Sequence, residues 1–311
     1  MYKYLFGPVP SRRLGMSLGI DLVPAKVCSL NCVYCEAGKT TKLTTERLEY
    51  VPYDKIISEL NHYFTTNPDP DYFTFSGSGE PTLNNRIGDV ITFLKNKKPD
   101  IPVAVLTNGT LLHDMNVRQS LKKSDLVMPS LDAATKETFN KINRPAKEID
   151  FNKYINGLID FSKKFTGKIW LEIFILPGYN DDEKELEELK KTVLKINPDL
   201  IQLNSLDRPG VLENLVKAPD ELLLKIKDSW GMDNIQIISS STNRKKMKFY
   251  NSDIENSILQ IISRRPCTLE DLSTVLNKNV LEIKKYLDIM QTENKITCEK
   301  QFRGVFYKIK Q

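Results

Sequence analysis

Cysteine and histidine are scarce in this chain, which has five cysteines and two histidines among 311 residues. So few cysteines argue against the disulfide framework that stabilises small secreted domains. The longest apolar runs fall well short of the roughly 18 residues that a membrane span needs. Residues 1–3 do not resemble the start of an export signal. The sequence therefore predicts a cytoplasmic protein with reduced cysteines and no membrane span.

The overall composition is that of an ordinary globular protein. Hydrophobic residues make up 40% of the chain and charged residues 27%, which is enough of each for a packed core and a solvated surface. A length of 311 residues accommodates one large α/β domain and a smaller second one. The formal net charge of +5 is mild, so it permits an anionic partner without requiring one.

Three of the cysteines lie in one short loop with the spacing C-x3-C-x2-C: Cys28, Cys32 and Cys35. Three ligands are one too few for a closed tetrahedral zinc site. They are the right number for a 4Fe–4S cluster with one iron left open for another molecule. Half of a zinc ribbon is the alternative. It would need a second Cys or His pair, and the two remaining cysteines, Cys267 and Cys298, are far apart near the C-terminal end of the sequence.

Strand and helix patterns alternate over the first 240 residues or so. Strands are expected at residues 17–22, 72–76, 103–107, 126–131, 169–175 and 200–205, with a further one at 235–238. Helices are expected near residues 52–64, 84–96, 111–122, 151–165, 181–194 and 220–230. The strand segments are almost continuously apolar, which is typical of a parallel sheet covered by helices. Six units of a strand followed by a helix predict a partial barrel, because a closed barrel has eight.

Ligands of parallel α/β folds bind at the carboxyl ends of the strands, so we expect ligand-binding residues in the turns that follow the strands. Gly77, Ser78, Gly79 and Glu80 follow the second strand. Glycine there lets backbone groups approach a ligand closely, although a plain turn is the alternative. Asn108 follows the third strand, where it either holds a turn or faces a ligand.

Polar residues also occur in the fourth and fifth strands. Ser130 and Asp132 point to the same side by the period of two, at the end of a buried strand, and we expect them to face a ligand. Glu172 lies among apolar residues of the fifth strand, so its carboxylate needs a partner. A cationic ligand or a core arginine would each supply one.

The cysteine loop, with Tyr34 just before its third cysteine, resembles the signature of the radical S-adenosylmethionine (radical SAM) superfamily. Residues 77–81 resemble the motif with which that family holds the methionine amino group of SAM, although Ser78 separates two glycines that are usually adjacent. Residues 7–15, 141–145 and 202–209 resemble one branch of the family, described as related to the wyosine-base tRNA synthases. The resemblance covers about residues 4 to 215.

This resemblance implies a partial (βα)6 TIM-like barrel, a 4Fe–4S cluster on the three cysteines, and SAM on the open iron. Reductive cleavage of SAM would give a 5′-deoxyadenosyl radical that takes hydrogen from a substrate. The implied electron donor is a protein such as flavodoxin or ferredoxin. The residues that we expect around the cofactor are Tyr34, Gly77, Ser78, Gly79, Glu80, Asn108, Ser130, Asp132, Glu172 and Leu176.

Four arginines lie in or beside the stretches shared with that branch: Arg12, Arg13, Arg144 and Arg208. Arginine offers a planar fork of donors for phosphate or carboxylate, so these side chains are candidates for substrate binding at the barrel mouth. A surface or ion-paired role is the alternative for each.

The tail reads as a separate domain. We expect a barrel domain over residues 1–238, a basic linker over 239–253, and a small domain over 254–311. The small domain is expected to have three helices, the second opened by a capping box at Thr268, and then a hairpin. This pattern resembles a winged helix–turn–helix. Because this domain has ten basic but also seven acidic residues, its charge is only weak evidence for nucleic-acid binding.

Three functions remain open from the sequence. The first is radical SAM modification of RNA or of a peptide or protein that the tail delivers. The second is radical SAM chemistry on a small molecule, with a structural tail. The third is a cluster-bearing sensor that regulates transcription by binding DNA through the tail.

Overall fold

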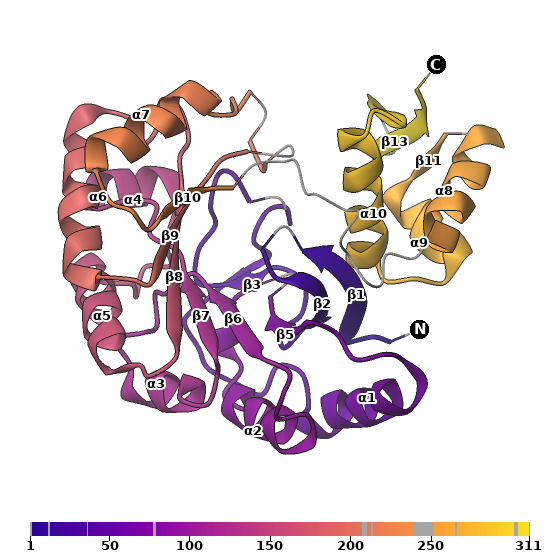
Figure 1. Cartoon of the computed structure of the whole chain (residues 1–311), viewed down its shortest axis with the longest axis horizontal. Helices are drawn as coiled ribbons and strands as arrows, with labels where there is room; N and C mark the ends of the chain where they lie inside the picture. The colour runs from indigo at the N-terminus through magenta and orange to yellow at the C-terminus, as the bar shows by residue number, and fades with distance from the viewer. Residues whose placement is uncertain are drawn as a thin grey trace. The chain divides into compact units, whose positions relative to one another are not determined.

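The computed structural model, shown in Figure 1, describes residues 2–11, 13–35, 37–76, 79–206, 210–212, 214–238, 252–264, 266–301 and 304–310. The chain divides into two compact units. The first, the barrel unit, comprises Asp21–Ser58 and Thr74–Ser239. The second, the terminal unit, comprises Met1–Ile20, Glu59–Phe73 and Ser240–Gln311.

The terminal unit brings together segments from the two ends of the sequence, which a linear division of the chain does not do. The boundaries at residues 238 and 254 stay predictions. Residues 239–251 of the expected linker lie outside the described residues, and the next helix begins at Ser252, two residues earlier than expected.

The main sheet has eight strands in the order β1-β2-β5-β6-β7-β8-β9-β10. Their bounds are β1 Leu5–Ser11, β2 Gly15–Ile20, β5 Tyr72–Phe75, β6 Val103–Thr107, β7 Leu126–Pro129, β8 Lys168–Phe174, β9 Leu200–Asn204 and β10 Ile235–Ile237. The β6–β7, β7–β8, β8–β9 and β9–β10 pairs are parallel, whereas β1 and β2 are antiparallel. The fold is therefore α/β with a mostly parallel, open sheet, and all seven expected strands are present. Strand β1 is additional, because its two prolines obscure the strand pattern.

Helices alternate with these strands, and Figure 1 shows α2, α3, α5 and α6 along the outer side of the sheet. The helices are α1 Tyr53–Thr66, α2 Ile87–Lys97, α3 Met115–Leu121, α4 Lys136–Ile142, α5 Phe151–Lys164, α6 Glu183–Ile196 and α7 Asp220–Trp230. Helix α3 begins four residues later than expected, because the Asp114 carboxylate caps the backbone N–H of Asn116 there. Helix α4 was not expected. The Thr135 side chain caps its first turn by accepting from Thr138 N, and Glu185, a residue distant in sequence, accepts hydrogen bonds from Ala134 N and Thr135 N just before the helix.

The tail forms three helices and a three-stranded sheet of order β11-β13-β12. The elements are α8 Ser252–Arg264, β11 Cys267–Thr268, α9 Leu269–Leu276, α10 Val280–Thr292, β12 Ile296–Gln301 and β13 Gly304–Ile309. The expected capping box is confirmed, since Thr268 and Asp271 bond each other's backbone N–H. Within the terminal unit α10 contacts β1, and the buried Glu282 carboxylate accepts a hydrogen bond from the backbone N–H of Gly7. Among the described residues no helix combines the length and apolar character required to cross a bilayer.

Candidate functional site

The cysteine loop begins at β3 (Val27–Cys28), which pairs in parallel with β4 (Lys42–Leu43). Segment 142–146, at the end of α4, holds the loop through its backbone. Asn31 N donates to the Asn143 carbonyl at 3.0 Å, and Val33 N donates to the Ile142 carbonyl at 2.9 Å. The path of the loop is thus set by a segment more than a hundred residues away in sequence. In the sequence, only the family resemblance of residues 141–145 pointed to this segment.

The three thiols of the loop are half-buried. Burial, and then the charge of Glu80, raise the pKa of Cys28 to about 11. Burial, and then the charge of Asp132, raise the pKa of Cys32 well above its usual value. The Cys28 and Cys32 thiols are therefore neutral unless a bound cation compensates a thiolate, as a metal centre does.

The donor set fits an iron–sulfur cluster better than a single ion. Among the described residues no three Cys, His, Asp or Glu side chains converge on a point where one ion could be held. Three cysteines that each ligate a different iron of a cluster need no such point, and thiolate is the usual ligand of these clusters.

Glu80 is the centre of a hydrogen-bond network that joins two turns. Its carboxylate, in a side chain only 2% exposed, accepts from Thr82 N at 3.0 Å, Thr107 Oγ1 at 2.7 Å and Asn108 N at 2.7 Å. Its backbone N–H donates to the Val27 carbonyl at 3.0 Å. Burial raises the pKa of Glu80, and these hydrogen bonds act in the opposite direction. Glu80 therefore fixes the turn after β5 to the turn after β6 and to β3. Gly77 and Ser78, expected in the same turn, lie outside the described residues.

Asn108 connects the turn after β6 to the cysteine loop. Its side-chain nitrogen donates to Ser29 Oγ at 2.9 Å and lies 3.5 Å from Cys28 Sγ. Its side-chain oxygen accepts from Thr110 N at 3.0 Å. The sequence left open whether Asn108 holds a turn or faces a ligand. The geometry is compatible with both roles, because the side-chain amide orders its own turn and also faces the Cys28 thiol.

Asp132 organises a second network on the other side of the loop. The carboxylate, 2% exposed, accepts from the Tyr34 hydroxyl, from Asn143 Nδ2 at 2.7 Å and from Phe174 N at 3.1 Å. The Tyr34 ring stacks on Phe174 with centroids 3.9 Å apart, and Asn143 Nδ2 also lies 3.4 Å from Cys32 Sγ. Asp132 thus holds the cysteine loop against β7 and β8. Direct contact of Asp132 or Tyr34 with SAM stays a prediction.

The other expected site residues differ in their surroundings. Ser130 is half-buried, and its carbonyl accepts from the Tyr154 hydroxyl at 2.7 Å. The half-buried Glu172 carboxylate accepts from Asn204 Nδ2 at 3.2 Å, so one of its partners is a neutral amide from β9. Leu176 has no exposed surface, which places it in the core.

Two of the four arginines lie in the described residues. Arg13 is half-buried in the turn between β1 and β2, where its backbone N–H donates to Ser11 Oγ. Arg144 is exposed and has a left-handed backbone with φ of 48°, immediately after Asn143. Arg12 and Arg208 lie outside the described residues.

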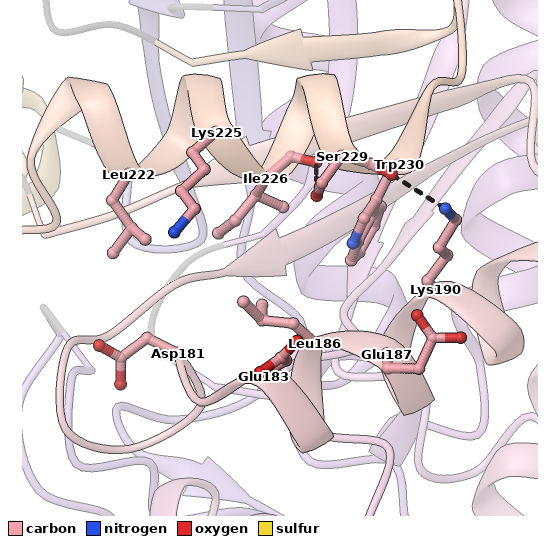
Figure 2. Close-up of a pocket in the computed structure, with 10 residues that line it drawn as sticks. All are labelled: Asp181, Glu183, Leu186, Glu187, Lys190, Leu222, Lys225, Ile226, Ser229 and Trp230. Atoms are coloured by element: carbon pink, nitrogen blue, oxygen red, sulfur yellow. Dashed lines mark hydrogen bonds between the residues drawn. The ribbon is translucent and has the colours of Figure 1, made fainter.

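Two cavities lie away from the thiols. The first, about 450 Å³, lies between α6 and α7; in Figure 2 Trp230 and Ile226 reach down toward α6, and Lys190 donates to the Ser229 carbonyl at 3.0 Å. The second, about 460 Å³, is lined by Thr45, Arg47, Asn85, Leu111, His113, Asp114, Asn116, Glu148 and Ile149. Neither set includes a residue of the cysteine loop.

We expect Gly79→Ala to damage the turn that carries Glu80. A Cβ at position 79 would lie 2.2 Å from the Val27 carbonyl oxygen, which is backbone and cannot move aside. The overpacking should cost about 1–3 kcal/mol of unfolding free energy and weaken SAM binding. Denaturant unfolding and equilibrium binding of SAM measure the two effects. Gly231→Ala, at the C-terminal end of α7, is the control: nothing lies within 4 Å of its added Cβ, but its φ of 61° strains an alanine backbone by about 1–2 kcal/mol, so it should lose stability without losing SAM affinity. Wild-type stability and affinity in Gly79→Ala would contradict the assigned packing.

We expect Asp132 to make the metal-free protein less stable as the pH rises from about 4 to 6. Burial raises the Asp132 pKa from 3.8 to about 6, so in this window the unfolded chain loses a proton that the folded chain keeps. The linked loss of unfolding free energy is at most about 3 kcal/mol. Urea unfolding of wild type and Asp132→Asn across this range isolates the effect, because asparagine does not titrate. If the difference in unfolding free energy between wild type and Asp132→Asn did not change with pH, this effect of Asp132 would be excluded.

Comparison with known proteins places these features in context. Residues 22–190 match the family model described as Radical SAM superfamily. GTPase Obg of Brachyspira hyodysenteriae is 39% identical over 298 residues, which are 96% of this chain but only 44% of that protein. A UPF0026 protein of Helicobacter pylori strain J99 is 32% identical over 306 residues, covering 97% of this chain and 96% of that one. The solved structure of TYW1 with a lysine-pyruvate adduct has a TM-score of 0.53 and 20% identity, over 74% of this chain and 76% of that one, which shows a shared fold.

Proposed function

Because the chain belongs to the radical SAM superfamily, we propose that Cys28, Cys32 and Cys35 ligate its 4Fe–4S cluster and that the turns after β5 and β6 bind SAM beside it. The chain is a radical SAM enzyme, and its cofactors are a 4Fe–4S cluster and SAM. The observation that carries the site assignment is the convergence of three segments. Glu80 joins the turns after β5 and β6, and Asn108 joins them to the cysteine loop.

The reaction that we propose is reductive cleavage of SAM followed by hydrogen abstraction. A cluster held by the three cysteines would supply the one electron for cleavage of bound SAM, and the products would be methionine and a 5′-deoxyadenosyl radical. The chain's own residues supply position. Glu80 and Asn108 fix the turns that face the cofactor, and Asp132 holds Tyr34 and Asn143 so that the cysteine loop keeps its shape. A small protein reductant of the flavodoxin or ferredoxin kind is the proposed electron donor, and the cytoplasm the proposed location.

We propose a macromolecular substrate, with RNA and a peptide or protein as the two classes to separate by experiment. The resemblance of residues 7–15, 141–145 and 202–209 to relatives of wyosine-base tRNA synthases supports RNA. Arg144 is exposed within segment 142–146, which holds the cysteine loop, and its guanidinium suits a phosphate or a carboxylate.

The DNA-binding regulator is the weaker reading of the tail. Three helices and a sheet of order β11-β13-β12 support a winged-helix assignment. However, a recognition helix inserts exposed side chains into a DNA groove, and no side chain of α10 from Leu281 to Gln291 is exposed. Contact with β1 covers part of this helix. We therefore propose that α10 has a structural role in the terminal unit.

The test is anaerobic reconstitution with iron and sulfide, reduction, addition of SAM, and chromatography of the products. The proposal expects 5′-deoxyadenosine in reduced samples and none without reductant. Fractions of cellular RNA and of protein are then added separately, and the stimulating fraction identifies the substrate class. A preparation that binds zinc in place of a cluster would remove the site assignment. A complete cluster with no SAM cleavage, with or without either fraction, would remove the proposed reaction.

A further inference from the structure

Lys26, two residues before the first cysteine, is an unusual residue in an unusual conformation. Its backbone is left-handed, with φ of 63°, and the residue is only 7% exposed. A left-handed backbone costs a non-glycine residue about 1–2 kcal/mol. Burial of a lysine adds a desolvation cost unless the ammonium has a partner. Glycine or asparagine would meet the backbone requirement more easily, so the side chain needs a separate explanation.

The backbone of Lys26 is fixed by the strand beside it. Its carbonyl accepts hydrogen bonds from Thr41 N at 3.0 Å and from Lys42 N at 3.2 Å. These contacts hold the residue just before β3.

The side chain ends at a thiol of the loop. Lys26 Nζ lies 2.9 Å from Cys35 Sγ, within hydrogen-bond distance of sulfur. Two buried carboxyl groups also lie near the loop, Glu80 beside Cys28 and Asp132 beside Cys32. Lys26 therefore brings a positive charge to a buried part of the loop, where the neighbouring buried ionisable side chains are acidic.

Such a charge acts on the energy of electron transfer. A 4Fe–4S cluster with three thiolates gains one negative charge when it is reduced. A nearby cation and an N–H donor to a ligand sulfur both stabilise the reduced form, and net charge and hydrogen bonds to sulfur are known determinants of cluster potential.

We propose that Lys26 raises the reduction potential of the 4Fe–4S cluster through a charge-assisted N–H···S hydrogen bond to Cys35. This inference rests on the proposed ligation of the cluster by the three cysteines. It goes beyond that function, because it assigns the ease of reduction to a residue outside the cysteine and glycine motifs. Lys26 is a tuning residue here rather than a ligand.

The test is an anaerobic redox titration of the full-length, reconstituted protein without SAM, followed by electron paramagnetic resonance of the reduced cluster. Lys26→Met keeps the length and burial of the side chain but removes its charge. We expect the equilibrium constant for reduction to fall about tenfold, which is a midpoint potential about 59 mV more negative for one electron. Lys26→Arg should retain most of the wild-type potential.

Lys42→Met is the matched control. Lys42 lies on β4 opposite Val27, but its side chain is 50% exposed and pairs with Glu46 at 3.7 Å. Solvent screens its charge, so its removal should leave the potential near that of the wild type.

Three results would overturn the inference. An unchanged potential in Lys26→Met would show that the ammonium does not act on the cluster. An unchanged potential with weakened SAM binding would assign Lys26 to the SAM carboxylate. Loss of the cluster from both Lys26→Met and Lys26→Gln would assign it to cluster assembly. A wild-type protein that forms no cluster would instead refute the proposed function, so the two failures are distinguishable.

Discussion

Replacing Cys32 by alanine is expected to leave the protein without a complete 4Fe–4S cluster and to abolish SAM cleavage. Burial raises the pKa of the Cys32 thiol well above its usual value, and Asn143 Nδ2 lies 3.4 Å from its sulfur. Alanine removes the thiol that we assign as a ligand. Iron and sulfide analysis, visible absorption and 5′-deoxyadenosine production after reduction measure the effect.

The control for this variant is Cys298→Ala. Cys298 is exposed on β12, in the terminal unit, where its sulfur accepts a hydrogen bond from the Gln291 side chain. We expect its iron content and SAM cleavage to equal those of the wild type. Full SAM cleavage by Cys32→Ala would contradict the assignment of the cysteine loop as the cluster site.

Replacing Glu80 by glutamine is expected to lower SAM cleavage about 100-fold while leaving the iron content nearly unchanged. The Glu80 carboxylate accepts from Thr82 N, Thr107 Oγ1 and Asn108 N, all of which are donors. Glutamine sets an NH2 group against one of these donors, so the turns move apart. A displacement of about 1 Å at a reacting centre costs roughly this factor. SAM affinity and the rate of 5′-deoxyadenosine formation measure the loss.

Glu185→Gln is a closely matched control. Glu185 is also 2% exposed, and its carboxylate likewise accepts from two backbone N–H groups and a hydroxyl, those of Ala134 and Thr135. Both variants should lose about 1–3 kcal/mol of unfolding free energy, because each leaves a buried donor unpaired. Only Glu80→Gln should lose SAM affinity. Equal losses of affinity in both variants would reduce the role of Glu80 to general stability.

Much of the α/β framework was predictable from the sequence because buried parallel strands are nearly continuous apolar runs. Strands β6 and β7, for example, are almost entirely buried, and their positions were found within two residues. Strand β1 was not predicted, since its prolines hide the pattern. Helix α4 was missed because it has only seven residues and because Glu185, about fifty residues away, holds the backbone just before it.

The candidate site divides in a similar way. The cysteine spacing and the turn at Glu80 are local patterns, so they could be read directly. The hydrogen bonds that saturate Asp132 come from Tyr34, Asn143 and Phe174, which lie far apart in sequence, and no local pattern reveals them. Lys26 gave no signal at all, because its importance depends on a backbone angle and on one contact with Cys35.

The attachment of the cysteine loop to segment 142–146 has a consequence for the life of the enzyme. Backbone hydrogen bonds at Asn31 and Val33, and one from Ala146 N to the Ser29 carbonyl, order the loop by folding alone. The entropy of arranging the ligands is therefore spent when the chain folds rather than when iron arrives. This differs from a zinc finger, whose fold depends on its metal. Oxidative loss of the cluster should leave a preorganised receptor, so that repair requires only iron, sulfide and electrons and no refolding of the chain.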